Sequence, residues 1–318
     1  MSMLLANLAS PVVLAFALGL IARAVRSDLT IPPQIQAYLS IFLLLAIGLK
    51  GGVELREQDA GSLALLLAVT LAAGAATAFS AFALARAWLR DGRINAAAMA
   101  AHYGSVSAVT FIAATQFTER SGHPPEGVMV ALLVALEVPA LLIGLALGRG
   151  AQGGEARTHH TLREVFTGKT AILLLGGLAI GAIAGKDGIK AVDAMYFALF
   201  QGVLMLFMLD LGMVAAGRLS ALREGWWRLL TFATGLPLLH GMIGVGVGHL
   251  CGLSVGGSAV FGAMLSSASY IAAPAAVRAG LPEADVGRCI TAALGLTFPL
   301  NLTVGIPLYT AFAQRLAG

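Results

Sequence analysis

The chain has 318 residues, of which 58% are hydrophobic and 11% are charged, and its mean hydropathy is +0.87. Soluble domains carry about a quarter charged residues, so this composition excludes the soluble classes and indicates an integral membrane protein. The formal net charge of +4 comes from arginines in predicted loops and does not indicate nucleic-acid binding. The 39 glycines and few aromatic residues favour a close-packed helical bundle over a β-barrel.

Ten stretches are long and apolar enough to cross a bilayer, which takes about 20 residues in a helix. They are residues 3–24, 31–50, 61–89, 94–117, 126–148, 169–187, 191–217, 226–250, 254–279 and 285–314. The first has no basic region before its apolar run, so we expect a retained span and not a cleaved signal peptide. One long polar break, at 148–169, separates five spans from five.

The charges of the loops predict the orientation. The loops after the odd-numbered spans hold 14 Lys or Arg residues, including Arg157 and Arg163 in the central linker, and the other side holds 6. The positive-inside rule therefore predicts that the linker is cytoplasmic and that both termini lie outside.

Short segments of the two halves match in order along the chain. The offsets are 164, 162 and 160 residues, for Gly48 with Gly212, Ser105 with Ser267, and Pro139 with Pro299. Since each half has five spans, the second half enters the membrane from the opposite side. We therefore predict two inverted five-helix repeats, at 1–149 and 169–318, joined by a cytoplasmic linker at 150–168.

The ninth span contains polar residues and a proline, "SSASYIAAPAAVRAG" from Ser266 to Gly280. Because Pro274 lacks an N–H and suits the first turn of a helix, we expect a helix that stops near Ser267–Ser269 and restarts near Ala272. The fourth span repeats the pattern with Gly104, Ser105, Ser107 and Thr110. Two half-helix N-termini that meet in mid-membrane would form an anion site. The alternative is that the serines bond to their own helices and that Pro274 is a kink.

Acidic residues are rare within the predicted spans. Glu137, midway through the fifth span, is a candidate partner for Na⁺ or a proton, because an unpaired carboxylate there is costly. Thr297, Asn301 and Thr303, in the repeat-related segment, add neutral oxygens. The alternative is a protonated Glu137 with a structural role.

Other polar residues receive simpler interpretations. Asp210 has an interfacial role or a coupling role, and a solvated ion pair is expected between Lys50 and Glu54, one helical turn apart. We expect His102 and His240 to be hydrogen-bonded packing residues. The sequence contains no metal-ligand spacing, phosphate loop or nucleophile motif, so it predicts no metal centre, organic cofactor or enzyme activity.

At these residues the chain resembles the sodium-dependent bicarbonate transporters of cyanobacteria and other bacteria. The strongest segment is "SSASYIAAPAAVRAGLPEA", which ends in an Arg-Ala-Gly-hydrophobic-Pro motif at Arg278 to Pro282. "GLKGG" at 48–52, "GSVSAVTF" at 104–111, "EVPAL" at 137–141 and "GIPLY" at 305–309 also match, in order.

The resemblance implies ten helices in two inverted repeats, a core domain that moves against a gate domain, and a homotrimer in the bacterial inner membrane. It implies Na⁺-coupled uptake of bicarbonate, or another small monoanion, between crossed fourth and ninth spans, with a possible PII-like regulatory protein on the cytoplasmic face. Carried over by position, the anion site comprises Gly104, Ser105, Ser107, Ser266, Ser267 and Ser269. The cation site comprises Glu137, Thr110, Thr297 and Asn301.

Two other functions remain open at this point. One keeps the fold and changes the substrate to an organic acid, as in symporters of the bile-acid-transporter type. The other is a membrane receptor or scaffold that does not transport. An intramembrane enzyme would need paired catalytic groups at one depth, which the sequence does not contain.

Overall fold

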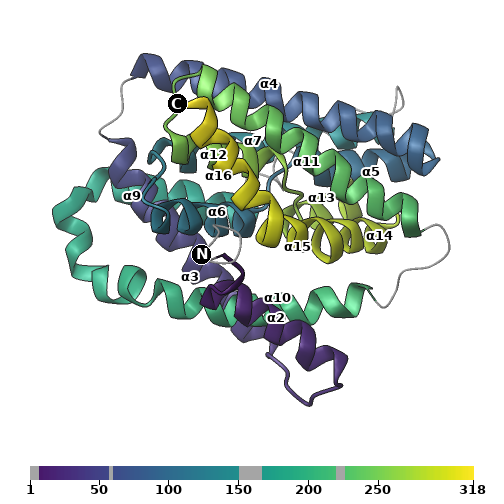
Figure 1. The fold of residues 1–318 in the computed structure, drawn as a ribbon, viewed down its shortest axis with the longest axis horizontal. Helices are drawn as coiled ribbons and strands as arrows, with labels where there is room; N and C mark the ends of the chain where they lie inside the picture. Colours follow the sequence, from purple (N-terminus) through teal and green to yellow (C-terminus); the bar gives the residue numbers. More distant parts are fainter. Residues whose placement is uncertain (1–6, 57–59, 150–166, 220–225) are drawn as a thin grey trace.

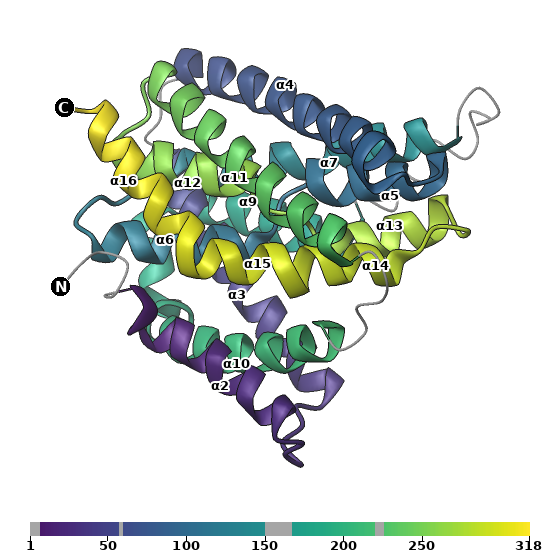
Figure 2. The ribbon, with the colours of Figure 1, turned by 45° about the vertical axis from the view of Figure 1, so that its right-hand side comes forward.

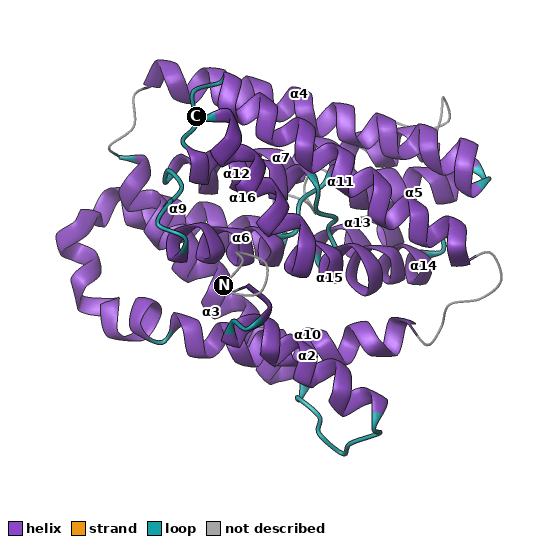
Figure 3. Ribbon diagram, in the orientation of Figure 1, coloured by secondary structure: helices purple, strands orange, loops and turns teal. Residues whose placement is uncertain are grey.

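The structure is a computed structural model that describes residues 7–56, 60–149, 167–219 and 226–318. Within these residues every regular element is a helix (Figure 3). Eight helical segments are long and apolar enough to cross a membrane: Pro33–Leu55, Leu63–Leu89, Arg93–Arg120, Val128–Gly148, Lys169–Val192, Phe200–Arg218, Trp226–Leu250 and Val286–Leu316. The prediction of an all-α integral membrane protein is therefore confirmed.

The elements follow the predicted spans in order. The first half contains α2 (Pro11–Ala24), α3 (Pro33–Leu55), α4 (Ala60–Leu84), η1 (Ala85–Leu89), α5 (Arg93–Gly104), α6 (Ala108–Arg120) and α7 (Val128–Arg149). The second half contains α9 (Lys169–Ile189), η3 (Lys190–Val192), η4 (Ala194–Ala198), α10 (Phe200–Leu219), α11 (Trp226–Leu250), α12 (Val255–Leu265), α13 (Ala272–Gly280), α14 (Val286–Ile290), η5 (Thr291–Thr297), α15 (Phe298–Leu300), η6 (Asn301–Gly305) and α16 (Ile306–Leu316).

Two of the ten predicted spans are represented by shorter helices. The described part of 3–24 is the 14-residue α2, and 254–279 is divided into α12 and α13. Most of the predicted linker at 150–168, including Arg157 and Arg163, lies outside the described residues.

Local sequence signals explain where several helices begin. Ser10 precedes α2, and its Oγ accepts the Val13 N–H at 3.4 Å. Ser254 caps α12 in the same way, through the Gly257 N–H at 3.1 Å. Side-chain oxygens at these positions satisfy N–H groups that have no partner inside the helix.

The helices form two groups (Figures 1 and 2). In the first, α2 packs along α10 and α3 packs along α9, and α10 also contacts α3. In the second, α4, α5 and α7 pack together, and α11 packs on α12, which contacts α6 and α16. Figure 2 shows α2 and α10 on the lower side, apart from α4, α5, α11 and α13 above them.

Glycines bring helices of the first group into backbone contact. A Cβ added to Gly177 of α9 would lie 2.8 Å from the Cα of Gly48 of α3, and one added to Gly212 of α10 would lie 3.0 Å from the Cα of Gly19 of α2. Small residues at such positions let membrane helices approach closely. The two helix pairs are therefore packed through matching glycine contacts.

Apolar residues also cover outward surfaces. On α2, Leu14, Leu18 and Ile21 are more than half exposed and lie on one face of the helix. By contrast, 94% of the most apolar stretch of Arg93–Arg120 is buried. The fourth span is thus central, while α2 presents a surface suited to lipid.

The glycine contact between α3 and α9 gives a prediction for stability. Gly177→Ala places a methyl group against the backbone of Gly48, so we expect it to destabilise the protein by about 1–3 kcal/mol. Gly176→Ala is the matched control, because a Cβ at Gly176 meets no atom within 4 Å. Thermal unfolding in detergent should show a lower midpoint for Gly177→Ala only. Equal midpoints would contradict this packing.

Candidate functional site

The fourth span is interrupted between α5 and α6. Helix α5 ends at Gly104, Ser105 and Ser107 have extended backbones, and α6 begins at Ala108. The Ser107 Oγ accepts the Thr110 N–H at 3.1 Å and so caps α6. The serine that interrupts the span thereby begins the next helix.

The ninth span is interrupted in the same way. Helix α12 ends at Leu265 and α13 begins at Ala272, with Pro274 in its first turn, where no backbone donor is required. The Ser269 Oγ accepts the Ala273 N–H at 3.1 Å. The prediction that both spans are interrupted at their serines is confirmed.

The two interruptions contact each other. The Ser107 N–H donates to the Ser267 Oγ at 2.9 Å, and the Ser269 N–H donates to the His102 carbonyl oxygen at 2.8 Å. Each break therefore supplies a hydrogen-bond partner for a backbone N–H group of the other break.

The remaining serines are bound to backbone carbonyls. Ser267 donates to the Met264 carbonyl at 2.7 Å, and Ser266 donates to the Ala263 carbonyl at 2.9 Å, both at the end of α12. Ser105 donates to the main-chain carbonyl of Glu137 at 3.4 Å. These three hydroxyl groups stabilise the breaks.

A small cavity lies where the two breaks meet. Its volume is about 10 Å³, close to that of one water molecule. Ser107 and Ser269 line it, together with Glu137 and Tyr270, and so do the first residues of α6 and α13. Because Ser107 and Ser269 accept backbone N–H groups, their own O–H groups remain available as donors.

Two larger cavities share lining residues with this small cavity. A cavity of about 440 Å³ shares Glu137 and Thr170 with it and extends to Lys169. A cavity of about 370 Å³ shares Tyr270 with it and is also lined by Arg218 and Arg278. Both reach the ends of the helices that carry these basic residues.

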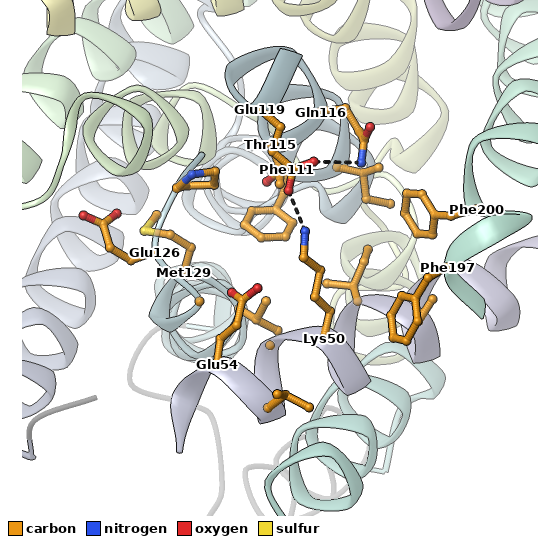
Figure 4. Close-up of a pocket in the computed structure, with 18 of the residues that line it drawn as sticks. Lys50, Glu54, Phe111, Thr115, Gln116, Glu119, Glu126, Met129, Phe197 and Phe200 are labelled. Carbon is orange, nitrogen blue, oxygen red and sulfur yellow. Dashed lines mark hydrogen bonds and ion pairs between the residues drawn. The ribbon is translucent and has the colours of Figure 1, made fainter. Parts of the chain in front are cut away.

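A fourth cavity, of about 500 Å³, lies between α3, α6, α7 and α10, and none of its lining residues lines the small cavity (Figure 4). Lys50 of α3 and Glu119 of α6 form an ion pair across it at 2.5 Å. The sequence predicted a pair of Lys50 with Glu54, one turn along the same helix, whereas the pair seen here joins Lys50 to a carboxylate of another helix. Gln116 of α6 and Gln201 of α10 are also hydrogen-bonded.

The four candidate cation ligands have different neighbours in the structure. Glu137 is 5% exposed and borders the small cavity. Thr297 bonds to the Ala233 carbonyl at 2.6 Å and to Tyr103 at 2.8 Å. The Asn301 Nδ2 donates to the Ser266 carbonyl at 3.0 Å.

Thr110 lies in the first turn of α6, three residues after Ser107. Asn301 is therefore connected to the ninth-span break, and Thr297 to the interface of η5 with α11 and α5. Of the four candidates, Glu137 is the one that lines the small cavity.

Other polar residues of the spans have identified partners. Gln36 of α3 donates to the Asp210 carboxylate at 2.5 Å. The His102 Nδ1 lies 2.8 Å from the Ala98 carbonyl, and the His240 Nε2 lies 2.8 Å from the Ser80 hydroxyl. These histidines are buried and hydrogen-bonded, as expected for packing residues.

Sequence reasoning missed Tyr270. It follows the serine run directly and lines the small cavity, but a single aromatic residue in an apolar span gives no signal that separates a site residue from a packing residue. Its position between Ser269 and the restarted helix was the available indication.

Comparison with protein-family models matches residues 11–314 to the Na⁺-dependent bicarbonate transporter superfamily. Comparison with curated protein sequences gave no match. The family match covers almost the whole chain and agrees with the resemblance carried by the serine segments. The chain therefore belongs to the Na⁺-dependent bicarbonate transporter superfamily, and it is a transporter and not an enzyme.

Proposed function

We propose that this protein takes up bicarbonate, or another small monoanion, together with Na⁺. One observation carries the proposal: two helix N-termini, two serine hydroxyls and one carboxylate meet at a single buried cavity. The first four groups attract an anion, and the fifth attracts a cation.

The anion side follows from the helix ends. Each N-terminus of α6 and α13 presents N–H groups and the equivalent of about half a positive charge. Ser107 and Ser269 add hydroxyl donors beside these ends. Among the described residues, no Lys or Arg lines the small cavity, so in this proposal the backbone and hydroxyl groups supply the attraction. Weak, neutral donors suit a substrate that must also be released.

The coupling side rests on Glu137. An ionised carboxylate next to a bound anion is repulsive, and the repulsion is strong where water is excluded. A Na⁺ ion between them removes that repulsion, so each ion favours the binding of the other. Thr110, Thr297 and Asn301 remain the proposed neutral ligands. In this proposal Thr297 and Asn301 exchange their present hydrogen bonds for the cation.

The proposed architecture is two inverted repeats. The packing supports it, because the second span contacts the sixth as the seventh contacts the first, through Gly48–Gly177 and Gly212–Gly19. We assign α2, α3, α9 and α10 to the gate domain and the other helices to the core domain. If both termini lie outside, as proposed, the cavities near Lys169 and Arg278 face the cytoplasm, and we assign the described state as open to the inside on that basis.

The family resemblance is the support for three further proposals. They are a homotrimer, a location in the bacterial inner membrane and control by a PII-like protein on the cytoplasmic side.

A second function has one observation in its favour. The cavity of about 500 Å³ is lined by Phe111, Phe197 and Phe200 and is much larger than bicarbonate (Figure 4). An organic acid with an apolar body would fit such a space. A Na⁺-coupled organic-acid symporter is therefore the alternative.

Uptake into proteoliposomes tests these proposals. We expect labelled bicarbonate to accumulate when a Na⁺ gradient is imposed and not when K⁺ replaces Na⁺. Na⁺-driven uptake of short-chain carboxylates without bicarbonate uptake would support the alternative. Ligand binding without uptake of either class would indicate a receptor.

Substitutions of the serines separate binding from packing. Loss of a hydrogen bond to a charged ligand costs about 1.5–3 kcal/mol, so Ser107→Ala and Ser269→Ala should each raise the apparent KM for the anion about ten- to hundredfold. Ser258→Ala is the control, because Ser258 is buried in α12 and donates to the Leu253 carbonyl at 3.2 Å, away from the cavity. The same KM for all three variants would exclude Ser107 and Ser269 as anion ligands.

Glu137→Gln tests the coupling role. The amide keeps the shape of the side chain and removes its charge, so we expect assembly to persist and Na⁺ stimulation of uptake to be lost. Uptake is measured against Na⁺ concentration, and size-exclusion chromatography reports assembly. Unchanged Na⁺ activation would exclude Glu137 as a cation ligand, and failure to assemble would indicate the structural alternative.

A further inference from the structure

Tyr270 has a buried hydroxyl group without a hydrogen-bond partner among the described residues. The side chain is 9% exposed, and its ring packs edge-on against Phe298, with ring centroids 5.7 Å apart. The ring is therefore fixed by packing. Its hydroxyl is not, since no protein group in the described chain holds it.

Tyr270 is one of the residues that line the small cavity. It lines that cavity together with Ser107, Ser269 and Glu137. The Ser107 side chain lies near the Tyr270 hydroxyl group, but the two do not meet the geometric criteria for a hydrogen bond. Tyr270 also lines the cavity of about 370 Å³ that contains Arg218 and Arg278. The residue thus stands between the two breaks and a basic cavity.

We propose that the Tyr270 hydroxyl donates a hydrogen bond to the transported oxyanion at the small cavity and so helps to determine substrate specificity. This inference rests on the proposed function, since it names a further ligand of the same anion. The substrate class is a small anion with an oxygen acceptor that can accept from Tyr270, Ser107 and Ser269 together.

The energetics favour a ligand over a packing role. A buried hydroxyl without a partner is less stable than a hydroxyl that is bonded or exposed to water. Phenylalanine would keep the contact with Phe298 and avoid this cost. A tyrosine at this position is therefore accounted for by a ligand that accepts its hydrogen bond during the transport cycle.

The position of Tyr270 relates the proposed contact to the route of the anion between two cavities. Tyr270 lines both the small cavity and the cavity of about 370 Å³, which is also lined by Lys169, Arg218 and Arg278. In this proposal, an anion that moves from the serines toward that cavity passes Tyr270 before it reaches the basic residues.

Tyr270→Phe tests the proposal, with Tyr196→Phe as the control. Tyr196 also carries a phenol that stacks on an aromatic ring, Phe42, at 5.2 Å, but it does not line the small cavity. The purified full chain is reconstituted, and Na⁺-driven uptake of bicarbonate, formate and nitrate is measured. In parallel, the same anions are added with Na⁺ to protein in detergent, and the shift of the thermal unfolding midpoint is recorded.

We expect Tyr270→Phe to raise the apparent KM for the anion about ten- to hundredfold. The anion concentration that gives half of the maximal thermal stabilisation should rise by the same factor. The unfolding midpoint without anion should be unchanged or higher, because the unpaired hydroxyl is removed. Tyr196→Phe should leave the anion dependence as in the wild type. A changed ratio among the three anions in Tyr270→Phe would support the specificity role.

The outcomes separate this proposal from the proposed function. If the wild type transports one of the anions and Tyr270→Phe has the same apparent KM for it, the role of Tyr270 is wrong and the transport function stands. If an anion stabilises the wild type more strongly than it stabilises Tyr270→Phe, but neither protein transports it, the contact is supported and the transport function is wrong. No stabilisation of the wild type by any of the anions would overturn both.

Discussion

The structure depends on the mutual satisfaction of backbone groups at two interrupted helices. An interrupted helix within a membrane exposes N–H and C=O groups that have no water to bind, and each unpaired group costs several kcal/mol. Here the N–H of Ser107 is bound by the hydroxyl of Ser267, and the N–H of Ser269 by the carbonyl of His102. Neither break would be stable in this form without the other.

The serines have two different roles, which depend on whether they follow the C-terminus of one helix or precede the N-terminus of the next. Ser266 and Ser267 follow α12, where the last carbonyls need donors, so their hydroxyl protons are used within the protein. Ser107 and Ser269 precede α6 and α13, where the first N–H groups need acceptors, so their hydroxyl protons remain available. The same residue type therefore stabilises the fold on one side of a break and can bind a ligand on the other.

The sequence could predict the breaks because their causes are local. A proline that suits only a first turn and serines that can cap a helix restrict the ninth span, and the match with the fourth span extends the inference. The partners of long side chains could not be predicted in this way. Lys50 pairs with Glu119 and not with Glu54 because the choice depends on how close α6 lies to α3. Thr297 bonds to Tyr103 and the Ala233 carbonyl for the same reason, since both partners come from other helices.

Tyr270 illustrates a different limit. Its residue type is common in helix cores, and only the three-dimensional position of its hydroxyl, buried and unpaired beside Ser107, distinguishes it from a packing residue. The contacts between the two helix groups could not be predicted from the sequence either. Its polar contacts, such as that of Gln116 with Gln201, join residues 85 positions apart.

The contacts within the first helix group and the contacts between the two helix groups resist movement to different degrees. Within the first group, α3 meets α9 and α2 meets α10 at glycines, so that backbone touches backbone and any sliding would bring larger side chains into collision. Between the groups, Lys50 and Glu119 form a half-exposed ion pair, and such pairs contribute about 0–1 kcal/mol. Contacts of this size can be broken and remade within a transport cycle. In the proposed transport cycle one helix group would move against the other, and the two breaks would move together because their backbones are hydrogen-bonded to each other.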